Sequence, residues 1–228
     1  MNNDTIQIWH GTIAAEEAHY QSYWRILNTA EQTRAGKFKS DLLRKRYVEV
    51  HGQLRNILAQ TLNELPEKLS IKIAEHGKPY LADTPELTFN LSHSANSIVI
   101  AVSRDCQLGV DIESCKPRVS MAALVDKCFA AEEIAFWNQL PEAQKISEFY
   151  RYWTRKEAFV KATGRGIALG LNECVINSEN QAVFLRVPAE CGEASTWHAL
   201  DITIEQDVCS ALVTDKEKIE VKLIALES

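Results

Sequence analysis

The sequence lacks the glycine-rich loops with which many nucleotide-binding enzymes hold phosphate groups. Neither Gly-x-x-x-x-Gly-Lys-Ser/Thr nor Gly-x-Gly-x-x-Gly occurs in it, which argues against an ordinary P-loop or Rossmann site. It also lacks the Gly-x-Ser-x-Gly turn of serine hydrolases, and no cysteine belongs to a recognisable Cys/His nucleophile signature. Any chemistry in this chain must therefore come from another arrangement of side chains.

Metal-binding cysteine pairs and membrane-spanning segments are also lacking. The six cysteines form no Cys-x-x-Cys pair and no compact Cys/His cluster, so zinc is not expected and free thiols in a reducing cytosol are the simplest prediction. Residues 1–4 do not begin a signal peptide, and the longest apolar run, residues 98–102, is far too short to cross a bilayer. We therefore expect a soluble cytoplasmic protein without membrane contact.

Length and charge limit the possible classes further. The chain of 228 residues is long enough for one large domain or two small ones with a buried core. Its formal net charge of -6 argues against nonspecific nucleic-acid binding. The positive residues nevertheless form one conspicuous stretch, made of Arg34, Lys37, Lys39, Arg44, Lys45, Arg46 and Arg55.

Both halves of the chain mix helix and strand patterns, which predicts an α/β (α+β) fold. Alternation predicts strands at 5–9, 71–74, 89–91, 97–103, 109–113, 173–177, 182–187, 197–204, 209–213 and 220–226. Helical periodicity covers 30–65, 121–140 and 146–162, with Pro66 ending the first stretch. A turn is expected at 76–79 and a polar loop at 92–96. The charged, proline-containing residues 116–118 are the best boundary, giving subdomains 1–115 and 116–228.

Two clusters of charged residues carry the functional signal. Asp111 and Glu113 are two residues apart in a predicted strand, so their carboxylates share one face. Glu157 and Lys161 are four residues apart in a predicted helix and therefore lie side by side. If helix and strand meet, three carboxylates and a lysine converge, which is what a magnesium ion and a phosphate ester require.

Each pair also has an ordinary structural explanation. Asp111 and Glu113 alone fit the solvated face of an edge strand, and Glu157 with Lys161 fits a surface pair stabilised by only about 0.3 to 0.5 kcal/mol. Trp153 lies one turn before Glu157, so that helix face is expected to enter packed structure. Buried carboxylates are costly unless a cation or hydrogen bonds compensate them, and a bound Mg²⁺ would do so.

Three further segments offer donors for an anion. Ser92 and His93 lie in the expected polar loop, although a histidine with a purely structural role is the alternative. Lys78 follows Gly77 in a sharp turn, and this is otherwise simply a loop. Arg46 lies in the basic helix, where its guanidinium could bind a phosphate with two hydrogen bonds, whereas the remaining positive residues form a solvated face.

In this order, the motifs resemble the 4'-phosphopantetheinyl transferases of the surfactin-synthetase-activating (Sfp) type. The matching segments, within residues 34 to 166, are Gly77-Lys78-Pro79, Phe89-Asn90-Leu91-Ser92-His93-Ser94, Gly109-Val110-Asp111-Ile112-Glu113 and Trp153-x-x-Lys156-Glu157-Ala158-x-x-Lys161-x-x-Gly164. The resemblance implies two similar α/β halves related by a pseudo-two-fold axis, with coenzyme A in the cleft between them. It also implies transfer of the 4'-phosphopantetheine arm to a serine of a carrier protein, which releases adenosine 3',5'-bisphosphate.

The resemblance also assigns roles to individual residues. Asp111, Glu113 and Glu157 match the Mg²⁺ ligands that hold the pyrophosphate of coenzyme A, and Lys161 matches the lysine that contacts this pyrophosphate. Positions expected at the adenosine end and its phosphates are Arg46, Lys78, Ser92 and His93. Glu157, or a water held by a carboxylate, would take the proton of the incoming serine, which makes Glu157 and Lys161 the expected catalytic residues.

The expected partners are coenzyme A and acyl- or peptidyl-carrier proteins, and the two-half design predicts a monomer. Fatty-acid, polyketide and nonribosomal-peptide carriers and an aminoadipate-reducing enzyme all remain open. Residues 119–129 form the candidate carrier surface, with ordinary helix packing as the alternative. Two other functions also remain open, namely a Mg²⁺-dependent hydrolase of the coenzyme A pyrophosphate and a noncatalytic binder of coenzyme A or carrier proteins.

Overall fold

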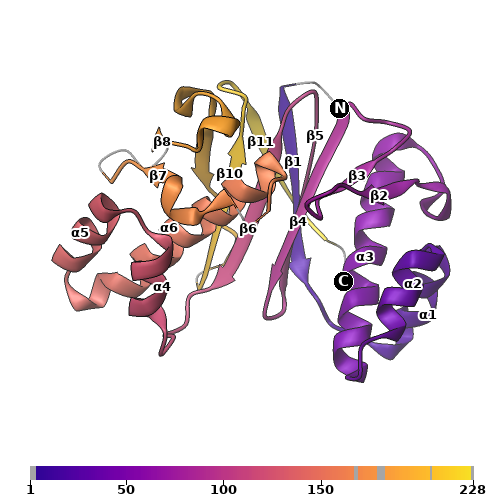
Figure 1. Ribbon diagram of the computed structural model, residues 1–228. Helices are drawn as coiled ribbons and strands as arrows, with labels where there is room; N and C mark the ends of the chain where they lie inside the picture. Colours follow the sequence, from indigo (N-terminus) through magenta and orange to yellow (C-terminus); the bar gives the residue numbers. More distant parts are fainter. Residues whose placement is uncertain (1–3, 167–168, 179–182, 206, 227–228) are drawn as a thin grey trace.

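Two sheets with helices on their outer faces make up the centre of the protein, in a computed structural model that describes residues 4–166, 169–178, 183–205 and 207–226 (Figure 1). The first half contains β1 (Thr5–Thr12), α1 (Glu17–Ile26), α2 (Thr29–Gly36), α3 (Asp41–Leu62), β2 (Ile71–Ile73), β3 (Pro79–Leu81), β4 (Leu87–Ser94), β5 (Ser97–Arg104) and β6 (Leu108–Ser114). The second half contains α4 (Met121–Cys128), α5 (Ala131–Gln139), α6 (Glu142–Thr163), β7 (Val175–Ile176), β8 (Phe184–Arg186), β9 (His198–Asp201), β10 (Val208–Thr214) and β11 (Glu220–Ala225). The predicted mixed α/β class is confirmed.

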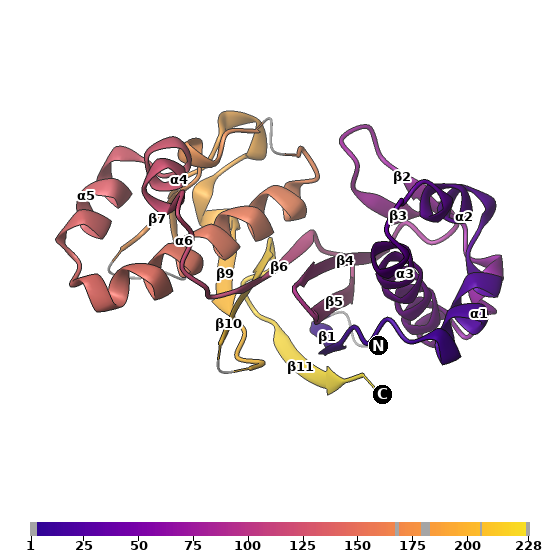
Figure 2. The ribbon, with the colours of Figure 1, turned by 90° about the horizontal axis from the view of Figure 1, so that it is seen from below.

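Of the two larger sheets, the first combines strands from both ends of the chain. One has the order β11-β1-β5-β4, in which β11 runs parallel to β1 and the other pairs are antiparallel. The other has the order β6-β10-β9 and is antiparallel. Figure 2 shows α1, α2 and α3 on one side of these strands and α4, α5 and α6 on the other. The pseudo-two-fold relation and the boundary at residue 116 stay predictions.

The alternation of side chains along β5 and β6 explains how these layers pack. In β5, Ile98, Ile100 and Val102 join the core beneath α3, while Val99 and Ala101 face the core between the two sheets. In β6, the apolar set formed by Leu108, Val110 and Ile112 joins the same intersheet core. The intervening residues of β6 therefore face α6.

Several expected boundaries are wrong because local capping overrides the apolar periodicity. The stretch 30–65 is divided between α2 and α3, where Ser40 accepts a hydrogen bond from the N–H of Leu43, and α3 ends at the left-handed Asn63 before Pro66 is reached. The stretch 121–140 is likewise two helices, since Glu133 caps the N–H of Ala130. Helix α1 and strand β3 were not expected, and residue 182 of one expected strand lies outside the described residues.

The expectation of a loop at 92–96 is wrong. Strand β4 runs through Ser94, and only Ala95 and Asn96 form the turn to β5, with Ala95 at φ 50°. Ser92 and His93 are therefore consecutive strand residues whose side chains leave opposite faces of the sheet. The polar composition that indicated a loop has a different cause, which lies in the contacts of β4 with β6.

The expectation of six free thiols is wrong for one pair, because Cys115 and Cys209 form a disulfide. Pairing of β6 with β10 places Cys209 opposite Glu113, and this brings the Cα atoms of the two cysteines to 6.2 Å. Their 94-residue sequence separation gives no hint of this proximity. The other four cysteines, Cys106, Cys128, Cys174 and Cys191, are free thiols. No helix within the described ranges combines the length and apolarity needed to span a membrane.

Close approach of α6 to β6 depends on Gly109. A Cβ atom at this position would lie far inside van der Waals distance of the carbonyl oxygen of Ala158 and the amide nitrogen of Ala162, both in the backbone of α6. Backbone atoms in a helix cannot rotate away as a side chain does. The glycine therefore lets α6 lie directly on the strand, which sets how near Glu157 comes to Asp111.

Gly109→Val should destabilise the protein by at least about 3 kcal/mol, since it overpacks a contact between two backbones. The free energy of unfolding from urea titrations measures this effect. Gly36→Ala is the matched control, because no atom lies within 4 Å of a Cβ built there. A Gly109→Val protein as stable as the Gly36→Ala protein would contradict the proposed role of this contact.

Candidate active site

Three carboxylates converge where α6 crosses β6. Asp111 and Glu113 point from β6 toward the helix, and Glu157 projects from α6 with its pKa perturbed by the charges of both. Asp111 is 5% exposed, while Glu113 and Glu157 are half-buried. The two-residue spacing in the strand and the close packing at Gly109 therefore bring together the acidic residues that the sequence predicted.

A polar seam joins β4 to β6, and we use this name for the contacts of Asn90, Ser92 and Ser94 with β6. The two strands are edges of different sheets, and side chains of β4 accept hydrogen bonds from alternate backbone N–H groups of β6. The bonds are Val110 N–H to Asn90 Oδ1 at 2.9 Å, Ile112 N–H to Ser92 Oγ at 3.4 Å and Ser114 N–H to Ser94 Oγ at 3.3 Å. These three side chains thus replace a backbone ladder between the sheets.

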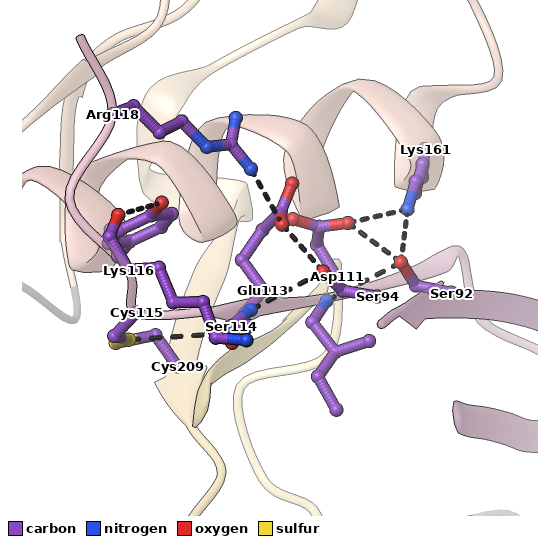
Figure 3. A network of polar contacts seen from close by, with 12 residues as sticks. Ser92, Ser94, Asp111, Glu113, Ser114, Cys115, Lys116, Arg118, Lys161 and Cys209 are labelled. Carbon is purple, nitrogen blue, oxygen red and sulfur yellow. Dashed lines mark hydrogen bonds and ion pairs between the residues drawn. A yellow bond between two sulfur atoms is a disulfide. The ribbon is translucent and has the colours of Figure 1, made fainter. Parts of the chain in front are cut away.

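The same two hydroxyl groups orient the carboxylates of β6. Ser92 Oγ donates to Asp111 Oδ1 at 2.8 Å, and Ser94 Oγ donates to Glu113 Oε2 at 2.8 Å. Each serine therefore accepts from the backbone of β6 and donates to one of its side chains (Figure 3). Sequence analysis did not identify Asn90 and Ser94, although the polar alternation at 90, 92 and 94 was the available signal.

Each of the two β6 carboxylates has one oxygen in an ion pair with a different cation. Lys161 Nζ lies 2.6 Å from Asp111 Oδ1 and 2.8 Å from Ser92 Oγ. Arg118 Nη2 lies 3.1 Å from Glu113 Oε2. Lys161 thus meets Asp111 as predicted, whereas Arg118, from the segment treated as a domain boundary, was missed.

The acidic cluster is incompletely compensated. Asp111 Oδ2 is buried and has no hydrogen-bond partner within the described structure. Burial raises the pKa of Asp111 even though Lys161 and Ser92 act against this shift. Burial first, and then the negative charge of Asp111, also raises the pKa of Glu157. A cation placed among these groups would remove the penalty.

The donor set fits a hard divalent cation. The candidate ligands are all carboxylate oxygens, which Mg²⁺ prefers, and the orphaned Asp111 Oδ2 is available to one. Within the described residues, no group of three or more His, Cys, Asp or Glu side chains is already arranged to hold a metal. Metal binding would therefore require small movements of the three carboxylates toward one point.

A cleft of about 590 Å³ opens beside Glu157 and Lys161. Its other walls come from α2, α3, β4 and the β2–β3 hairpin, so that segments far apart in the sequence enclose it. The side chains that can meet an anion or an aromatic ring there are Arg34, Tyr47, His51, His76 and Lys78. Tyr47 and His51 were missed, although their four-residue spacing on α3 was a usable signal.

Arg46 and His93 lie near each other outside this wall. Among the described residues, neither lines the cleft, and Arg46 Nη2 donates to Asn96 Oδ1 at 2.9 Å. The pKa of His93 is lowered, first by desolvation and then by the positive charges of Arg46 and Lys161. The two predicted residues are thus close together in an electropositive region, but the structure does not bring them into the cleft.

Two lysines of the recognised motifs have structural partners. Lys78 Nζ donates to the carbonyl oxygens of Leu108 at 3.0 Å and Ala162 at 2.8 Å, so its ammonium links the start of β6 to the end of α6. Lys156 is fully buried and lies 2.7 Å from Glu133. Lys156 therefore anchors α6 to α5, while Lys161, five residues later, faces the carboxylates.

Comparisons with known proteins identify the family of this chain. Residues 107–213 match the family described as the 4'-phosphopantetheinyl transferase superfamily, and residues 11–105 match the one described as 4'-phosphopantetheinyl transferase, N-terminal. The chain is 34% identical over 214 residues to 4'-phosphopantetheinyl transferase HetI of Nostoc sp., covering 92% of this chain and 87% of that protein. It is 31% identical over 172 residues to 4'-phosphopantetheinyl transferase psf-1 of Bacillus pumilus, covering 74% and 72%.

This protein belongs to the 4'-phosphopantetheinyl transferase superfamily. A further relative, 4'-phosphopantetheinyl transferase AcpT of Escherichia coli strain K12, is 40% identical over 110 residues, covering 48% of this chain and 55% of that protein. The predicted family and enzyme class are thus confirmed. The matches do not single out the surfactin-synthetase-activating type.

The contacts of Lys78 lead to a prediction about pH. Burial lowers its pKa from 10.5 to about 8, so between these values the unfolded chain binds more protons than the folded protein. The free energy of unfolding gains a contribution that is lost as the pH falls through 8 and is complete above 10.5. Urea titrations at pH 7.5 and 9.5 should therefore show wild type gaining stability relative to Lys78→Met as the pH rises. Parallel changes in the two proteins would contradict the lowered pKa.

Proposed function

We propose that this protein transfers the 4'-phosphopantetheine arm of coenzyme A to a serine of an acyl- or peptidyl-carrier protein. The observation that carries the proposal is the cluster of Asp111, Glu113, Glu157 and Lys161 at the edge of the 590 Å³ cleft. Coenzyme A offers a pyrophosphate for this cluster and a 3'-phosphorylated adenosine for the cleft. Family membership supports the same reaction.

Coenzyme A would lie with its pyrophosphate near Lys161 and its nucleotide along α3. The cationic and aromatic residues of the cleft wall, Arg34, Tyr47 and His51, suit a phosphorylated nucleoside. Arg46 and His93 would meet the 3'-phosphate from the neighbouring electropositive region, and Ser92 would hold Lys161 in place. Because its ammonium is bound to two carbonyls, Lys78 would contribute to the cleft chiefly through its apolar stem.

Asp111, Glu113 and Glu157 would hold Mg²⁺. The orphaned oxygen of Asp111 supports this assignment, and so do the raised pKa values of Asp111 and Glu157, because burial makes these negative charges costly unless a cation compensates them. When bound, the metal ion would offset charge on the pyrophosphate oxygens. Lys161 would add a second positive charge on the side of the cleft.

The acceptor serine would be activated by Glu157. Within the described residues, no hydrogen bond or ion pair engages this carboxylate, so it could accept the proton of the serine through an oxygen that the metal ion does not hold. The serine Oγ would attack the phosphorus attached to pantetheine while its proton passes to Glu157. The bond from this phosphorus to the oxygen of the leaving phosphate breaks, which releases adenosine 3',5'-bisphosphate. Lys161 would stabilise the charge that develops on the phosphate oxygens.

The proposal includes a monomeric enzyme, as the two-half design of the sequence predicts. The predicted cytoplasmic location suits this role because coenzyme A and carrier proteins would meet the enzyme there. We retain the subdomain boundary near residue 116 as part of the proposal, with the polar seam lying between the two halves.

The transfer is tested directly by the intact mass of an apo-carrier protein after incubation with this protein, coenzyme A and Mg²⁺. A gain of about 340 Da, the mass calculated from the formula of the arm, that disappears in chelator would support both the transfer and the need for a divalent cation. Cleavage of coenzyme A without carrier modification would instead identify a hydrolase. Intact coenzyme A with every carrier type would identify a noncatalytic binder.

Glu157→Gln should lower the rate of carrier modification by at least about 100-fold, since it removes the general base and one metal ligand. The thermal midpoint of the metal-free protein should stay equal or rise, because the substitution removes a negative charge that Asp111 repels. Glu142→Gln, on the same helix with a side chain 88% exposed, is the control and should retain full activity. Turnover by Glu157→Gln within about threefold of wild type would remove Glu157 from the mechanism.

His93→Ala should raise the KM for coenzyme A about two- to tenfold and leave kcat nearly unchanged. The imidazole lies beside Arg46, which supplies the formal positive charge there, so its removal costs about one hydrogen bond to the ligand. His19→Ala, an exposed change on α1, serves as the control. A KM equal to that of the control would show that His93 does not contact coenzyme A.

A further inference from the structure

Arg118 occupies a defined place beside the acidic cluster. Its guanidinium lies 3.1 Å from Glu113 Oε2 and stacks over the ring of Tyr150 at 5.4 Å. The hydroxyl of Tyr150 donates to the carbonyl oxygen of Lys116 at 2.7 Å, which fixes the segment that carries the arginine. The contact of Arg118 with Glu113 is therefore supported by the ring of Tyr150 on α6 and by the fixed backbone at Lys116.

Arg118 and Lys161 approach the two β6 carboxylates from opposite sides (Figure 3). Each cation shares its carboxylate oxygen with a serine of the polar seam, Ser94 for Glu113 and Ser92 for Asp111. Lys161 lines the cleft, whereas Arg118 is not among the described residues of its wall. Arg118 thus contacts the cluster without belonging to the coenzyme A pocket.

We propose that Arg118 is a resident counter-ion of Glu113 that opposes metal binding, because a divalent cation that binds this carboxylate must weaken or displace the ion pair. The inference rests on the metal site of the proposed function and concerns how readily that site fills. In the metal-free protein, Arg118 and Lys161 together offset part of the charge of three carboxylates. In the metal-bound protein, the guanidinium and the metal ion compete for the same carboxylate.

The exposure of the pair makes this displacement feasible. The side chain of Arg118 is 37% exposed, so water can solvate the guanidinium as soon as it leaves Glu113. Such an exposed ion pair is weak, and Ser94 still holds Glu113 Oε2 after the arginine has left. Arg118 therefore acts as a positioning residue that lowers metal affinity moderately, by an expected factor of about two to five.

Arg118→Ala should bind Mn²⁺, used as a paramagnetic substitute for Mg²⁺, about two to five times more tightly than wild type. Titrations followed by electron paramagnetic resonance would measure the dissociation constant without substrates. Metal should also raise the thermal midpoint more in the variant than in wild type. Lys116→Ala is the matched control, because it removes the same charge from an exposed residue in the same segment and should leave the affinity unchanged.

Equal tightening in Lys116→Ala would overturn the proposal, because it would reduce the effect to net charge. Weaker Mn²⁺ binding by Arg118→Ala would also overturn it, because the arginine would then hold Glu113 in the geometry that the metal ion needs. An unchanged affinity would show that Arg118 and the metal ion do not compete for Glu113. If wild type binds no Mn²⁺ although carriers are modified, the metal assignment fails with the proposal and the transfer stands. Arg118→Gln keeps a polar side chain of similar length and replaces Arg118→Ala if that variant does not fold.

Discussion

The polar seam between β4 and β6 is the constraint on which the rest of the site depends. Two edge strands of separate sheets meet, and the side chains of Asn90, Ser92 and Ser94 take the place of backbone partners for β6. Edge N–H groups that are buried without a partner would each cost about 1 to 3 kcal/mol. The seam therefore joins the sheets and at the same time fixes the strand that carries Asp111 and Glu113.

Electrostatic strain in the cluster follows from this arrangement. The seam and the close contact of α6 at Gly109 hold three carboxylates near one another in a buried place, and burial raises the pKa values of Asp111 and Glu157. Lys161 and Arg118 satisfy one oxygen on each β6 carboxylate, and Asp111 Oδ2 remains without a partner among the described residues. In the proposed function, a metal ion and the pyrophosphate of coenzyme A would bind at this cluster together.

Sequence reasoning reached the residues whose positions follow from local periodicity. Two-residue spacing predicted the shared face of Asp111 and Glu113, and four-residue spacing placed Glu157 and Lys161 on one face of α6, although the ammonium of Lys161 pairs with Asp111. Sequence reasoning failed where a contact depends on elements that are far apart in the chain. The ammonium of Lys78 binds two carbonyls from distant elements, and the disulfide of Cys115 with Cys209 depends on the register of β6 with β10. Likewise, the polar residues 92–96, which predict a loop, are largely strand, because Ser92 and Ser94 form hydrogen bonds with the neighbouring strand β6.

The exchange rate of the Val110 amide proton, measured by NMR in the wild type and in Asn90→Ala, tests the seam most directly. The account predicts strong protection in wild type, close to that of the central amides of β5, because this N–H donates to Asn90 inside the protein. It also predicts that Asn90→Ala loses much of this protection while the β5 amides keep theirs. Exchange of Val110 in wild type at the rate of an exposed loop would contradict the account, because β6 would then not be held by β4.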